Sequence, residues 1–188
     1  MTDGRSKPPQ IAASLVNGLR RNLIEDGVWE RIEADVLTRE PMLDGWLRDA
    51  DEEEWVSLEG HLRFTEALRQ ILGDEALAAR GAARLREDVD VGPLAPLLRS
   101  WIRGFANDAS ELMRVAPHVY QAITRNAGRM VLVDSQEGHI RFAIQGGPPL
   151  LGELRGWPAL IEGSGESCFS SRGGAARCRS GPTTTAPR

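Results

Sequence analysis

The chain contains 188 residues, of which 41% are hydrophobic, and its formal net charge is -4 at pH 7. A chain of this length buries about 70% of its unfolded surface in one domain, so we expect a single hydrophobic core. Basic and acidic residues are interspersed, which argues against a nucleic-acid-binding protein. The chain also lacks the roughly 18 consecutive apolar residues of a membrane span, and its opening, MTDGRSKPPQ, lacks the apolar core of a signal peptide. We therefore expect a cytoplasmic protein that binds neither nucleic acid nor membranes.

The first half of the chain has the periodicity of amphipathic helices. Apolar residues at every fourth position predict a first helix that Asp26-Gly27 ends, namely Ile11, Leu15, Leu19 and Leu23. A second helix is predicted from Val28 to Leu37, before Pro41. The acidic run from Asp49 to Glu54 predicts either an exposed connection or the negatively charged first turn of a helix.

Two further helices follow around a glycine. Leu58 to Leu72 predicts a long helix with Gly73 as its stop, and Asp74 is expected to cap the next one, from Glu75 to about Arg86. The strongest apolar stripe comes after Pro93 and predicts the central core helix; its residues are Leu94, Leu97, Leu98, Trp101, Ile102 and Phe105. Short helices are predicted from Ala109 to Val115 and from Pro117 to Ile123.

The pattern changes to strand, turn and strand between Arg129 and Gln145. The first strand is apolar on both faces, whereas Ile140, Phe142 and Ile144 alternate with polar or small residues, so we expect a central first strand and a half-solvated second one. Because a two-stranded hairpin is marginally stable alone, it should pack on the helices, with a further strand or a partner beside it. Helices followed by a hairpin predict an α+β fold, mainly helical in its N-terminal two-thirds.

The end of the chain predicts a short helix and then a tail. Leu150 to Ile161, with Trp157, should return to the core, whereas the Gly-, Ser-, Arg- and Thr-rich composition that follows predicts disorder. The expected organisation is a flexible N-terminus (1–9), one α+β domain (10–163) and a disordered tail (164–188).

No residue pattern supports catalysis or a cofactor. The three histidines, His61, His118 and His139, have no helical histidine partner, and the serines form no nucleophile elbow. Cys168 and Cys178 lie in the polar tail without neighbouring histidines, so neither a disulfide framework nor a zinc site is indicated. We expect a non-enzymatic protein without metal or cofactor.

Several segments together resemble one family. They are IAASLVNGLRRNL, EEEWVSLEGHLRFTEALRQILGDEALAARGAA, LRSWIRGFANDASELMRVAPHVYQAIT and the hairpin followed by GWPALIEG. They resemble an uncharacterised family of paralogues of about 200 residues from myxobacteria, itself distantly similar to heme-NO-binding and vinyl-reductase-type ligand-binding domains. The resemblance covers about residues 10 to 163; the C-terminal end departs from it. Heme is not implied, because the Tyr-x-Ser-x-Arg signature is absent and Tyr120 is the only tyrosine.

The resemblance implies a small-ligand-binding or sensory module in a bacterial signalling context. The residues predicted to line an apolar pocket are Trp101, Phe105, Tyr120, Val133 and Phe142, although plain core packing is the more common role of such residues. The alternative is a protein–protein interaction or assembly module that uses the exposed edge of the hairpin, with a homodimer as one form.

Overall fold

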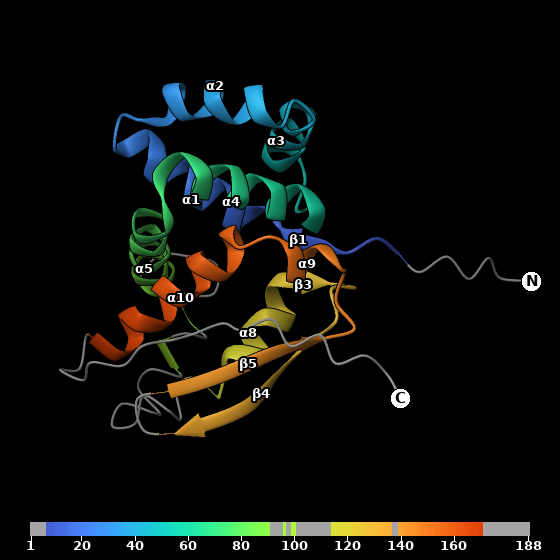
Figure 1. The fold of residues 1–188 in the computed structure, drawn as a ribbon, viewed down its shortest axis with the longest axis vertical. Coiled ribbons are helices and arrows are strands. Elements are labelled where there is room, and N and C mark those ends of the chain that lie inside the picture. Colours follow the sequence, from blue (N-terminus) through green and yellow to red (C-terminus); the bar gives the residue numbers. More distant parts are fainter. Residues whose placement is uncertain (1–6, 91–95, 97–98, 101–113, 137–138, 171–188) are drawn as a thin grey trace, which may run out of the picture.

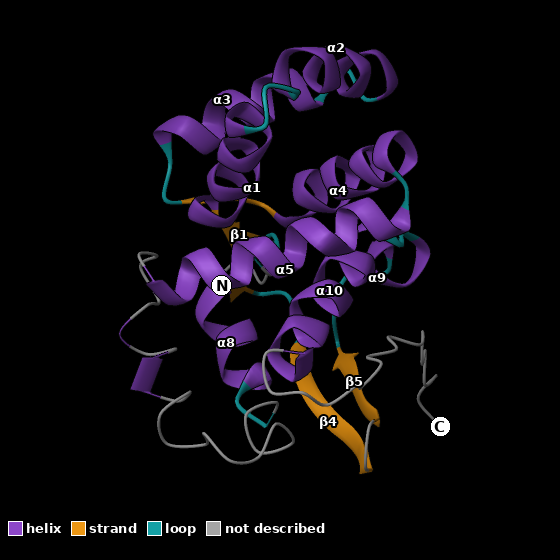
Figure 2. Ribbon diagram, turned by 90° about the vertical axis from the view of Figure 1, so that its left-hand side faces the viewer, coloured by secondary structure: helices purple, strands orange, loops and turns teal. Residues whose placement is uncertain are grey.

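The computed structural model describes residues 7–90, 96, 99–100, 114–136 and 139–170, and it has the predicted α+β architecture (Figure 1). The helices in this part of the chain are α1 (Ala13–Glu25), α2 (Trp29–Arg39), α3 (Leu43–Glu52), α4 (Leu58–Leu72), α5 (Asp74–Asp90), α8 (Ala116–Ile123), α9 (Leu150–Glu153) and α10 (Gly156–Ser170). The strands are β1 (Gln10–Ala12), β2 (Trp55–Ser57), β3 (Thr124–Arg125), β4 (Arg129–Gln136) and β5 (His139–Gln145). Figures 1 and 2 show α2 and α3 at one end, the β4–β5 hairpin at the other, and α1, α4, α5 and α10 between them.

A small antiparallel sheet, in the order β2-β1-β3, ties the N-terminus to two later segments. Ile11 pairs with Val56 in β2 and with Thr124 in β3, and its side chain is fully buried. The first helix therefore begins at Ala13, and the expectation that Ile11 lies on it is wrong. Strands of two or three residues are too short to show a period in the sequence, which is why this sheet was not predicted.

Helices α2, α4 and α5 lie where the apolar periodicity predicts them. Helix α4 has the predicted bounds; the Ser57 hydroxyl accepts a hydrogen bond from the Gly60 N–H, and Gly73 ends the helix with φ of 86°. The acidic run belongs to the C-terminal half of α3 and the connection after it. Helix α3 was not predicted, yet it buries Leu43, Trp46, Leu47 and Ala50.

The core lies where α1, α2, α3 and α4 meet. Helix α10 packs against α4 and α5 beside it. The fully buried residues of the core include Val16, Leu23, Ile32, Leu62 and Leu68. The helix predicted from Pro93 to Phe105 lies almost entirely outside the described residues, as does the one predicted from Ala109 to Val115. The described core is therefore built around α4, and the helix predicted to be central is not tested.

The C-terminal region continues the helical part of the fold. The predicted segment from Leu150 to Ile161 forms α9 and most of α10, and α10 runs on to Ser170, past the predicted boundary at residue 163. A Cβ atom added at Gly163 would overlap the carbonyl of Ala78, so α10 and α5 are in backbone contact there. This packing explains a helix where composition alone predicted disorder.

Candidate functional site

The described members of the predicted pocket differ in their burial. Tyr120 is 2% exposed and belongs to the core, whereas Val133 is 47% exposed. Phe142 is half-buried and packs against the core cluster. Trp101 and Phe105 lie outside the described residues.

Tyr120 has a structural environment. Its hydroxyl donates a 2.7 Å hydrogen bond to the Ala127 carbonyl, and its ring stacks on Trp157 with the centroids 5.9 Å apart. Burial raises the pKa of Tyr120 to about 12, which makes the phenol a poor proton donor in chemistry near neutral pH. It fixes the turn between α8 and the hairpin.

The hairpin is the predicted feature that the structure supports best. Strands β4 and β5 pair antiparallel, with Met130 opposite Ile144, Val131 opposite Ala143 and Leu132 opposite Phe142. The register then shifts, so that Asp134 lies opposite Arg141 and Val133 is the extra residue of a β-bulge. The turn residues 137–138 lie outside the described part of the chain.

The two faces of the hairpin differ in their surroundings. Successive side chains of a strand point to opposite faces, so Met130, Leu132, Phe142 and Ile144 share one face. Met130 is 7% exposed, and Phe142 and Ile144 pack on the core cluster, so this is the inner face. Arg129, Arg141 and Gln145 are exposed on the outer face, next to the half-buried apolar pair Val131 and Ala143.

Helix α8 packs against β4 (Figures 1 and 2). Within the described residues, β4 pairs with β5 alone. The outer edge of β4 therefore presents backbone N–H and C=O groups that no described strand satisfies.

A second polar feature lies inside the helical layer. His61, on α4, is 1% exposed, and its Nδ1 atom has no hydrogen-bond partner. The imidazole meets Trp157 edge to face, with the centroids 6.0 Å apart, and lies 6.5 Å from the Trp46 ring. Burial lowers the pKa of His61 to about 4, so the ring is neutral near pH 7.

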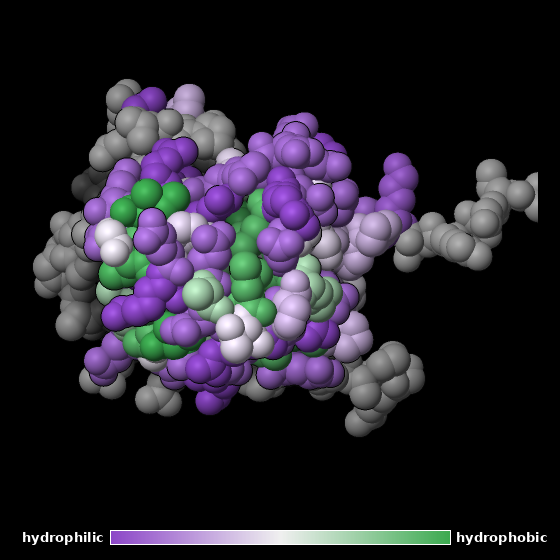
Figure 3. Space-filling view, turned by 90° about the horizontal axis from the view of Figure 1, so that it is seen from above, coloured by the Kyte–Doolittle hydropathy of each residue, from purple (hydrophilic) through white to green (hydrophobic). Residues whose placement is uncertain are grey.

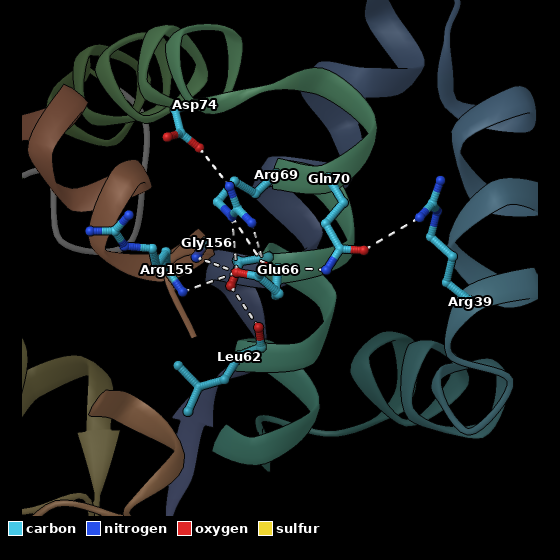
Figure 4. Close-up of polar contacts among 9 residues, drawn as sticks. Arg39, Leu62, Glu66, Arg69, Gln70, Asp74, Arg155 and Gly156 are labelled. Carbon is cyan, nitrogen blue, oxygen red and sulfur yellow. Dashed lines mark hydrogen bonds and ion pairs between the residues drawn. The ribbon is translucent and has the colours of Figure 1, made fainter. Parts of the chain in front are cut away.

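Glu66 joins α4 to the start of α10 (Figure 4). Its carboxylate accepts hydrogen bonds from the backbone N–H groups of Arg155 and Gly156 at 3.0 and 2.9 Å, and from the Arg69 guanidinium at 2.7 Å. Arg69 also pairs with Asp74 at 3.0 Å. Burial would raise the pKa of Glu66, but the hydrogen bonds from Arg69, Arg155, Gln70 and Gly156 lower it to about 2.

This carboxylate acts as a clamp between two helices. It satisfies free N–H groups at the N-terminus of α10, where a negative charge is favourable. A Cβ atom at Gly156 would overlap the backbone of Thr65, so the close approach requires glycine at this position. Glu66 is not among the residues that the sequence predicts to be functional, because local patterns carry no signal for a contact between residues 90 positions apart.

The other two histidines complete the set of candidates. His118 is exposed, and the side chain of His139 is not described. In the described part of the chain, no three His, Cys, Asp or Glu side chains are grouped as metal binding would require. None of the described helices combines the length and apolar character needed to cross a membrane.

Comparisons of the chain with protein-family models, curated proteins and solved structures give no match. The similarity to the myxobacterial family therefore stays a prediction.

Proposed function

We propose that this chain is a non-enzymatic interaction module that binds a protein segment along the outer edge of β4. The observation that carries the proposal is the two-stranded hairpin itself: among described residues β4 pairs with β5 alone, and its apolar Val133 is exposed. Strand addition would satisfy the free backbone groups and cover the exposed Val133. A cytoplasmic location and a role in bacterial signalling belong to the same proposal.

The surface at the other end of the molecule supports the choice of the hairpin. Seen from above, over α2 and α3, the face is largely hydrophilic with narrow apolar bands (Figure 3). Among the described residues, the other large exposed apolar side chains are Ile24, in α1, and Met42, in the turn between α2 and α3; neither lies on a strand. The hairpin offers apolar side chains and free backbone groups together.

The test is selection of short peptides from a displayed random library on the purified chain. We expect extended, apolar peptides whose affinity falls at least tenfold for Val131→Lys, because a lysine on β4 would place a charge beside the added strand. Ala143→Lys is the matched control, since Ala143 lies opposite Val131 on the same face but on β5. Peptides that bind both variants as well as the wild type, or no enrichment at all, would contradict strand addition at β4.

A small apolar ligand is the second candidate function. It is favoured by the unpartnered Nδ1 of His61, a buried polar atom among Trp46 and Trp157 that a ligand hydroxyl or amide could satisfy. Extraction of the purified protein followed by mass spectrometry, with thermal-shift screening, tests it. A bound compound that is lost in His61→Phe supports this function; no compound and no thermal shift count against it.

A further inference from the structure

The charges on the outer face of β4 are arranged symmetrically about its centre. Five positions separate Arg129 from Asp134, an odd number that would place them on opposite faces of a regular strand. The bulge at Val133 changes this. Arg129 lies opposite Gln145 and Asp134 opposite Arg141, and because these two β5 residues are four apart, Arg129 and Asp134 share the outer face. Val131, opposite Ala143, lies between them on the same face.

This pattern is complementary to itself. If a second β4 strand lies antiparallel beside the first with Val131 on the two-fold axis, Met130 meets Leu132 of the second copy. The bulge then brings Arg129 opposite Asp134 of the second copy, and the symmetry repeats this pair at the other end. Opposite charges facing each other across neighbouring strands stabilise the pairing and fix its register.

We propose that the partner of the β4 edge is a second copy of this chain, which pairs β4 with β4 to form one four-stranded antiparallel sheet. The inference rests on the proposed function and names its partner. In the dimer β4 becomes a central strand, and its outward backbone N–H and C=O groups become hydrogen-bonded. Asp134 would then lie between Arg141 of its own hairpin and Arg129 of the second copy.

The edge of β5 lacks this complementarity. Strand β5 carries Arg141 but no acidic residue, so two β5 edges would bring no ion pair together. Pairing of β4 with β5 of another copy would leave a free edge at each end and would extend into open chains. The β4–β4 arrangement is isologous and closes after two copies.

The test is a charge exchange followed by sedimentation equilibrium of the full chain from low micromolar to millimolar concentration. Arg129→Asp places two carboxylates opposite each other at both ends of the interface, and Asp134→Arg does the same with two guanidinium groups. We expect each single variant to weaken dimerisation about tenfold or more. The double variant exchanges the two charges and should dimerise more strongly than either single variant, but less strongly than the wild type, because Asp134→Arg also faces Arg141 of its own hairpin. Circular dichroism at each step shows that all variants remain folded.

Two outcomes would overturn the inference. Wild-type chain that stays monomeric over the whole range excludes the β4–β4 dimer, whereas the peptide selection still tests the proposed function separately. A dimer that both single variants and the double variant leave unchanged uses another surface. Val131→Lys, which would bring two lysines together on the two-fold axis, must weaken a β4–β4 dimer more than Ala143→Lys does.

Discussion

Glu66 connects two helices that are far apart in the sequence, and its contribution can be isolated at the scale of one residue. Glu66→Gln removes the charge that Arg69 and the N-terminus of α10 face, and its amide group cannot accept all of the same hydrogen bonds. We expect the free energy of unfolding to fall by about 1–3 kcal/mol, measured by urea denaturation. Glu59→Gln, which loses only the exposed pair with Arg63, should cost under about 1 kcal/mol. Equal losses in the two variants would contradict the clamp.

The buried imidazole of His61 makes a specific prediction about pH. Its folded pKa of about 4 lies below the unfolded value of 6.5, so the unfolded chain takes up the proton first as the pH falls. The stability is complete above pH 6.5 and is lost progressively between pH 6.5 and 4, by roughly 3 kcal/mol. In His61→Phe this part of the pH dependence should disappear, while His118→Gln, at an exposed site, should keep it. Denaturation curves at several pH values that show the same slope for wild type and His61→Phe would disprove the assignment.

At the scale of whole elements, the packing of α10 on α5 depends on a glycine. Gly163→Val would drive a side chain into the Ala78 carbonyl, so we expect the melting temperature to fall and the variant to lose about 1–3 kcal/mol of stability. Gly152→Ala in α9 is the control, because a Cβ atom there meets nothing within 4 Å, and it should be neutral or slightly stabilising. A Gly163 variant that melts like the wild type would show that α10 is not held against α5 in solution.

The helices also show which parts of the fold the sequence pattern predicts and which it does not. Helix α4 was predicted with its correct bounds, because its apolar stripe is long and Gly73 marks its end. Helix α3 was missed because its acidic C-terminal half resembles a solvated connection, although its first half is buried. The last turns of α10 were missed because their helical state depends on contact with α5 rather than on composition.

Some features of the candidate site could also be predicted from the sequence, and others could not. A run of apolar residues was sufficient to predict β4, and alternation of apolar and polar or small residues was sufficient to predict β5. The bulge at Val133 has no signature in the sequence, yet it decides that Arg129 and Asp134 share a face. The predicted pocket combined Tyr120 and Val133, which the structure separates into core and surface, because hydrophobicity alone does not distinguish these positions.

At the scale of the whole molecule, the helical layers and the hairpin have different roles. The helices build a closed core around α4, and the Glu66 clamp and the Gly163 contact attach α10 to it. The hairpin packs on this body through one face only and leaves the outer edge of β4 without a described strand beside it. We therefore place the stability of the protein in the helices and its proposed association in the hairpin.

Hydrogen–deuterium exchange at low and high protein concentration tests this division most directly. If two β4 edges pair, amides in β4 should exchange more slowly at high concentration, because the outward N–H groups become hydrogen-bonded, while β5 and the helices change little. The Arg129→Asp variant should lose this concentration dependence, and the double exchange with Asp134→Arg should recover part of it. Exchange in β4 that is the same at both concentrations, or protection that appears in β5 instead, would contradict the account.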